Sequence, residues 1–115
     1  MRVKVKIVVF EHPAPQTFGK FCGYCPATKY FCSGTDVTDI SNRITDILMI
    51  VLQQRKKFPN YLKKRGWKIT ENSIESPIFT DKELVQLTES SYVLKINNPI
   101  IVELDVKIPQ PQELF

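Results

Sequence analysis

One segment, residues 36–54, carries the long helical pattern of this 115-residue chain. Its apolar side chains recur every three or four positions, which is the spacing of one face of an α-helix. Thr35 or Asp36 is the expected N-cap, and the pattern predicts a helix from about Asp36 to Gln54 or Arg55. A helix with one apolar face fits a fold in which it covers the apolar face of a sheet. The apolar stripe consists of Val37, Ile40, Ile44, Ile47, Leu48 and Val51.

Strand patterns lie on both sides of this helix. Residues 2–10 alternate apolar with mostly basic side chains, and residues 100–108 alternate apolar with charged ones, which predicts two half-buried strands. The aromatic-rich residues 18–25 and residues 28–33 predict two further strands. The expected fold class is therefore α+β: a three-stranded antiparallel meander, a long amphipathic helix, a short inserted segment and a final strand.

Residues 55–98 carry shorter patterns, which we interpret as an insertion before the final strand. Thr80-Asp81-Lys82-Glu83 is a capping box, which predicts a short helix that runs to about Thr88. The length of the chain favours one domain, residues 1–109, followed by a flexible proline-rich tail, residues 110–115. The other expected elements are a helical turn at 60–65, a short strand at 67–69, a loop at 70–78, a strand from Tyr92 to Ile96 and a turn from Asn97 to Pro99.

Charge is distributed unevenly along the chain, whose net charge is +4. Residues 55–68 carry seven bases and no acid, whereas residues 69–115 carry three bases and eight acids. Such a basic segment is a solvated helix end or linker in one interpretation. In the other it binds nucleic acid, with Phe58, Tyr61 and Trp67 stacking on bases. The candidate contacts for nucleic acid or another partner are Arg55, Lys56, Lys57, Lys63, Lys64, Arg65 and Trp67.

The chain has three cysteines, Cys22, Cys25 and Cys32. An odd number argues against a closed disulfide framework and is typical of a reducing compartment. Cys22 and Cys25 have the spacing of a metal or redox motif, and His12 with Cys32 could complete four zinc ligands. A strand over this segment would, however, point Cys22 and Cys25 to opposite faces. We therefore expect no metal, no cofactor and mostly buried thiols, with a zinc or redox role as the alternative.

Residue patterns typical of catalysis are weak. The single histidine, His12, stands beside a proline in a loop, and the sequence has no glycine-rich phosphate loop. Asp36 and Asp39 are explained by helix capping. We expect no catalytic residue and no enzymatic activity. The amino terminus lacks the apolar stretch of a signal peptide, and no apolar run approaches the roughly 18–20 residues of a membrane span. The expected location is the cytoplasm.

Residues 21–54, FCGYCPATKYFCSGTDVTDISNRITDILMIVLQQ, resemble the HicB-like antitoxin family. The shared features are Cys25-Pro26 at the end of an aromatic strand, Ser33-Gly34 before the helix, and the apolar helix positions Ile44, Leu48 and Leu52. With the preceding strand, the resemblance covers residues 2–54, about half of the chain.

This resemblance implies a partial RNase H-like fold that lacks the nuclease carboxylates. It also implies a protein-binding role, because the family binds a small toxin ribonuclease and blocks it. The expected function is therefore that of the antitoxin in a toxin–antitoxin system, with a toxin and further copies of the chain as partners. The alternative function is nucleic-acid binding through residues 55–68, for which weak binding is expected in any case.

Overall fold

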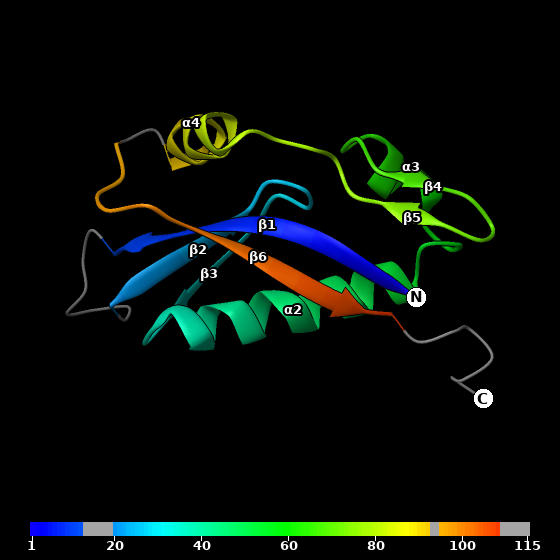
Figure 1. The fold of residues 1–115 in the computed structure, drawn as a ribbon, viewed down its shortest axis with the longest axis horizontal. Coiled ribbons are helices and arrows are strands. Elements are labelled where there is room, and N and C mark those ends of the chain that lie inside the picture. Colours follow the sequence, from blue (N-terminus) through cyan, green and yellow to red (C-terminus); the bar gives the residue numbers. More distant parts are fainter. Residues whose placement is uncertain (13–19, 93–94, 109–115) are drawn as a thin grey trace.

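The computed structural model describes residues 1–12, 20–92 and 95–108. Its main sheet is antiparallel, with four strands in the order β3-β2-β1-β6. The long helix α2 (Val37–Gln53) lies along one face of this sheet, as Figure 1 shows. The predicted α+β class is confirmed, with its meander, long helix and final strand. The strands of the main sheet are β1 (Arg2–Glu11), β2 (Phe21–Cys25), β3 (Tyr30–Gly34) and β6 (Ile100–Lys107).

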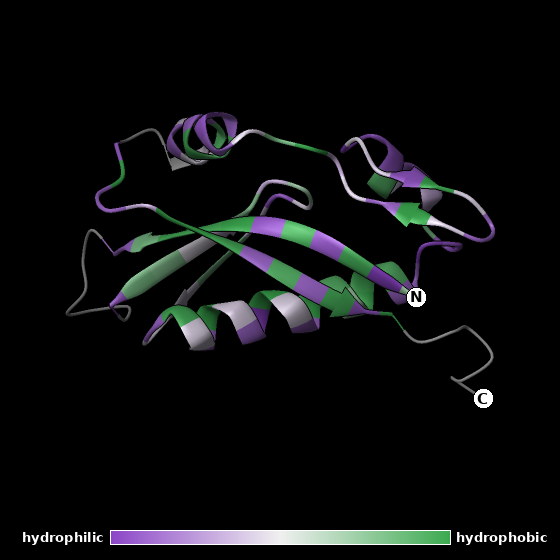
Figure 2. Cartoon of the chain, in the orientation of Figure 1, coloured by the Kyte–Doolittle hydropathy of each residue, from purple (hydrophilic) through white to green (hydrophobic). Residues whose placement is uncertain are grey.

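The sheet and α2 enclose the main core. The predicted stripe of α2 points inward, and its members Ile40, Ile44 and Leu48 are buried. Leu52, one turn beyond Leu48 and outside the predicted stripe, is buried as well. Alternate residues of β1 and β6 meet this stripe, which explains the banding of both strands in Figure 2. Gly23 in β2 allows the close approach of the helix, because a Cβ atom there would overlap the side chain of Ile40.

Two carboxylates fix the beginning of α2. Asp36 is the N-cap, and its side chain accepts a hydrogen bond of 2.7 Å from the backbone N–H of Asp39. The carboxylate of Asp39 accepts bonds from the backbone N–H of Thr35 (3.0 Å) and from Nε of Arg43 (3.1 Å). The Thr35 bond first, and then Arg43, lowers the pKa of Asp39. Both aspartates thus have a structural role, as the sequence predicted.

The opposite face of the sheet carries a smaller core under α4 (Asp81–Tyr92). Val8, Phe10 and Cys22 pack there against the buried Leu84 of α4. The predicted capping box forms with both of its bonds: Glu83 N–H donates to Thr80 Oγ1 at 3.1 Å, and Thr80 N–H donates to Glu83 Oε1 at 2.9 Å. This face of β1 is apolar at the end that α4 covers, where Val8 and Phe10 are buried. It is charged at the other end, where Arg2, Lys4 and Lys6 are exposed.

Two expectations for residues 70–98 are wrong. The strand from Tyr92 to Ile96 does not form as predicted, because Tyr92 is the last residue of α4 and the described residues 95–96 are not in a strand. The helix continues past Thr88 because Thr88 is buried and Ser91, one turn later, donates a hydrogen bond to the hydroxyl of Tyr24 (3.2 Å). The predicted loop at 70–78 contains β5 (Ile74–Glu75), which pairs with β4 (Lys68–Ile69).

The inserted segment begins with α3 (Pro59–Lys63), which together with β4 corresponds to the predicted turn at 60–65 and the strand at 67–69. Residues 18–19 of the predicted second strand and the predicted tail, residues 110–115, lie outside the described residues. Among the residues that the structure describes, no helix combines the length and apolar character that crossing a membrane requires.

Candidate partner-binding surface

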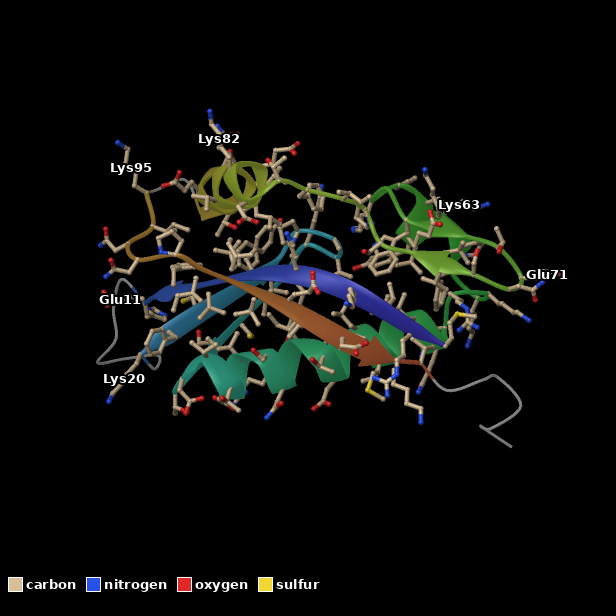
Figure 3. The ribbon with its side chains drawn as sticks, viewed as in Figure 1. Glu11, Lys20, Lys63, Glu71, Lys82 and Lys95 are labelled. Atoms are coloured by element: carbon tan, nitrogen blue, oxygen red, sulfur yellow. The ribbon has the colours of Figure 1, made fainter. Side chains whose placement is uncertain are left out.

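The basic segment, residues 55–68, begins just after α2 and includes the whole of α3 and the first residue of β4. All five of its lysines are exposed, and Figure 3 shows Lys63 pointing away from the body of the molecule. None of the ion pairs in the described part of the chain involves these lysines. Their charge is therefore available to a partner. The exposed lysines are Lys56, Lys57, Lys63, Lys64 and Lys68.

Two of the predicted contact residues are buried instead. Arg55 is 6% exposed, and its Nη1 donates a hydrogen bond of 2.9 Å to the carbonyl oxygen of Leu52, close to the end of α2. Trp67 is 3% exposed, and its Nε1–H donates to the carbonyl oxygen of Ala27 at 2.7 Å. Both side chains are buried, and Trp67 belongs to the main core. Their position does not support the predicted contact role, because a buried ring cannot stack on a base.

Arg65 follows α3 and packs against Tyr61 of that helix. Its guanidinium carbon lies 3.8 Å from the centre of the Tyr61 ring, and its Nη1 donates a hydrogen bond of 2.8 Å to the Tyr61 carbonyl oxygen. The Tyr61 hydroxyl in turn donates to the carbonyl oxygen of Thr28 (3.1 Å), in the turn between β2 and β3. This stacked pair is a cation–π contact. It leaves Arg65 half-buried and less available to a phosphate than the five exposed lysines.

An apolar groove lies beside the lysines, between the end of α2 and α3. The sequence analysis did not predict it. Phe58 and Ile50 are 54% and 52% exposed, and Tyr61 is 39% exposed. A signal was present, because Ile50 falls outside the predicted apolar stripe of the helix and so points away from the sheet. We call this feature the α2–α3 groove; it is lined by Val51, Gln54, Phe58, Tyr61 and Leu62.

The cysteines occupy both faces of the sheet. Cys25 packs in the core under α2 and Cys22 in the core under α4, so the predicted separation of the two thiols is confirmed. Cys32 is half-buried on the α2 side. Burial raises the pKa of Cys25 and of Cys32. Among the described residues, no group of three or more histidine, cysteine, aspartate or glutamate side chains is placed to hold a metal ion.

The surface thus consists of an apolar groove whose lining residues Phe58 and Leu62 adjoin lysines of the basic segment in the sequence. His12, the other candidate of the sequence analysis, lies near the loop end of β1, where its backbone N–H donates to the carbonyl oxygen of Lys20 at 2.9 Å. Comparison of the chain with known proteins finds no matching family model, no matching curated protein and no matching solved structure.

Proposed function

We propose that this chain is a non-catalytic protein-binding module that binds and neutralises a small toxin ribonuclease, as a HicB-like antitoxin does. The observation that carries the binding role is the α2–α3 groove with its exposed Phe58, together with the exposed Ile50, which precedes the lining residue Val51. Both Phe58 and Ile50 are more than half exposed. Clustered apolar side chains of this size on a surface mark interaction sites. The antitoxin role is supported by the resemblance of residues 21–54 to that family.

A protein partner fits this surface better than a nucleic acid does. The groove is lined by aliphatic and aromatic side chains, and aromatic anchors of this kind dominate the energy of protein interfaces. Trp67, the largest ring that could have stacked on a base, is buried. The lysines at the border of the groove then supply orientation and a faster association with a partner that carries acids around an apolar patch.

The test requires a small basic reading frame next to this gene and uses its purified product. We expect the chain to bind this product and to stop its ribonuclease activity. The double variant Ile50→Ala/Phe58→Ala weakens the complex about 30-fold or more, because truncating a central apolar anchor costs about 2 kcal/mol or more. Calorimetric titration measures the affinity, and an RNA-cleavage assay measures the inhibition.

Leu87→Ala is the matched control. Leu87 has the same number of carbon atoms as Ile50 and is 40% exposed, but it lies on α4, away from the groove. This variant should leave the affinity unchanged. An equal affinity for the parent chain and the double variant would remove the groove from the proposal. A neighbouring product that cleaves RNA equally well with and without bound parent chain would remove the antitoxin role.

Nucleic-acid binding is the second candidate, favoured by the five exposed lysines of the basic segment and the exposed Phe58 ring. We expect this binding to be weak, independent of sequence and lost near physiological salt, because the five net negative charges of residues 69–115 offset the field of the basic segment. The logarithm of the affinity should fall by roughly 0.7–0.9 per phosphate neutralised as the logarithm of the salt concentration rises. Fluorescence anisotropy with a labelled oligonucleotide measures it.

Two triple variants with the same loss of charge separate a local site from a general effect. Lys56→Gln/Lys63→Gln/Lys64→Gln changes the basic segment, and Lys20→Gln/Lys82→Gln/Lys95→Gln changes exposed lysines far along the chain, which Figure 3 shows pointing outward. Equal, small effects of both are expected. Tight binding at physiological salt that the first variant abolishes and the second spares would make nucleic-acid binding the better proposal.

A further inference from the structure

We propose that the outer edge of β6 pairs with β6 of a second copy of this chain, so that two four-stranded sheets join into one continuous antiparallel sheet. β6 is eight residues long and ends the strand order β3-β2-β1-β6. Within the described residues no strand pairs with the outer edge of β6. Figure 1 shows the strand β6 in front of β1. This inference concerns a different surface from the α2–α3 groove and does not rest on the proposed function.

The pairing of β6 with β1 determines which backbone groups face outward. Ile108 N–H donates to the carbonyl oxygen of Met1 at 2.8 Å, which continues the β1–β6 ladder beyond the strand ends. In an antiparallel pair, every second residue of a strand forms backbone hydrogen bonds with the neighbouring strand. Since Ile108 is bonded to β1, the even-numbered residues of β6 are bonded to β1 as well. The N–H and C=O groups of Glu103, Asp105 and Lys107 therefore point away from β1. A row of such groups is a template for another strand.

Charge selects the register of the second copy. With Asp105 on the twofold axis, Glu103 stands opposite the partner's Lys107, and Lys107 stands opposite the partner's Glu103. Opposite charges directly across a strand pair stabilise it. Each Asp105 on the axis is neutralised within its own sheet by Arg2, at 3.2 Å. On the other face of the sheet, this register brings Leu104 opposite the partner's Val106, which is an apolar pair.

The neighbouring registers are less favourable. An axis at Leu104 places Glu103 opposite the partner's Asp105, so that two like-charged pairs oppose each other. An axis at Glu103 places Asp105 opposite the partner's Ile101, which gives neither an ion pair nor an apolar pair.

An axis at Val106 also pairs opposite charges, Asp105 with the partner's Lys107, but it places Glu103 opposite the partner's Pro109, which has no N–H to donate. The register with Asp105 on the axis pairs opposite charges without losing that donor, and it is the one we propose. Its three outward-facing positions exchange roughly six backbone hydrogen bonds, at two bonds for each bonded pair.

Two charge variants and their mixture test this register. Lys107→Glu places glutamates opposite each other in the pair, and Glu103→Lys places lysines opposite each other. We expect sedimentation velocity to show a dimer for the parent chain and monomers for each variant alone. An equimolar mixture of the two variants should dimerise again, because both cross-strand pairs then carry opposite charges.

The fold of the variants is controlled within the same experiment. Lys107 stands opposite Arg2 in its own sheet, so Lys107→Glu creates an attractive pair there and keeps the monomer folded. Glu103→Lys loses a contact of 3.7 Å to Lys4, and its circular dichroism is compared with that of the parent chain. A parent chain that stays monomeric at all concentrations contradicts the proposal. So does a dimer that survives in both single variants.

A cysteine on the axis gives a second measurement. Asp105→Cys brings two thiols face to face across the proposed axis, and mild oxidation should yield a covalent dimer. Asn42→Cys, at an exposed position of α2, is the matched control, and the parent chain gives the background from Cys32. Equal cross-linking of the two variants would show that the chains do not meet at β6.

Discussion

Aspartate at position 44 or 48 unfolds this domain, whereas aspartate at position 45 leaves it folded. Ile44 and Leu48 are completely buried at the centre of the α2 stripe. An unpaired carboxylate at either position costs several kcal/mol, which is comparable to the whole stability of a small domain, about 5–15 kcal/mol. Thr45 lies on the adjacent flank of α2 and is half-buried, so Thr45→Asp should cost less than about 1 kcal/mol. Thermal unfolding followed by circular dichroism measures all three variants.

Ile44→Val controls for the volume of the side chain. It removes one methylene without adding charge and should cost about 0.5–1.5 kcal/mol. Similar losses of stability in Ile44→Asp, Leu48→Asp and Thr45→Asp would mean that α2 is rotated relative to the sheet. The position of Gly23 makes such a rotation costly, because Ile40 approaches its backbone more closely than a side chain at position 23 would permit.

Local periodicity was sufficient to predict most of the fold. The phase of α2 follows from the spacing of its apolar residues, and the alternation of β1 and β6 follows from a sheet with one fully covered face. The pairing of β6 with β1 could not be read in the same way, because the two strands are almost a hundred residues apart in the sequence. A period of two indicates that each is a strand, but it does not identify the neighbour of either one.

The errors have a common physical cause, which is tertiary packing. The segment around Tyr92 is rich in residues that favour strands, and yet α4 extends to Tyr92. Leu84, Thr88 and Ser91 share one face of that helix and reach the sheet, where Ser91 bonds to Tyr24. Contacts of this kind depend on a face of β2 that is remote in the sequence. They outweigh a local preference worth a fraction of a kcal/mol per residue.

The candidate site was predicted in part. The sequence predicted the basic segment as a candidate contact surface, and the five lysines of this segment are exposed. It could not separate these lysines from Arg55, which is buried because its guanidinium bonds to the carbonyl of Leu52 at the end of α2. The sequence does not distinguish an arginine whose side chain is buried and hydrogen-bonded from one whose side chain is solvated. The α2–α3 groove depends on how α3 folds back, which no periodicity describes.

Trp67→Ala destabilises the protein by about 3–5 kcal/mol, the usual cost of truncating a buried aromatic side chain. The ring is 3% exposed and packs in the main core with Leu62 and Ile74. Its Nε1–H bond of 2.7 Å to the carbonyl oxygen of Ala27 joins the insertion to the turn between β2 and β3. The variant therefore loosens α3, β4 and β5 together. Urea unfolding followed by circular dichroism measures the free energy of unfolding.

Trp67→Phe and Phe58→Ala separate the contributions to this loss. Trp67→Phe keeps most of the packing but leaves the Ala27 carbonyl without its donor, which costs about 1–3 kcal/mol. Phe58→Ala truncates an exposed ring nearby and should cost less than about 1 kcal/mol. If Trp67→Ala costs no more than Phe58→Ala, the insertion is not coupled to the core.

The fluorescence of Trp67 tests in solution whether its ring lies in the core or stacks on a nucleic-acid base. Trp67 is the single tryptophan of the chain, so its fluorescence reports on this site alone. A buried ring emits at short wavelength and is shielded from iodide. Because the ring cannot leave the core without breaking its bond to Ala27, adding an oligonucleotide should not quench it, even where the lysines bind phosphate. Quenching by the oligonucleotide in a folded protein would place Trp67 at a nucleic-acid interface after all.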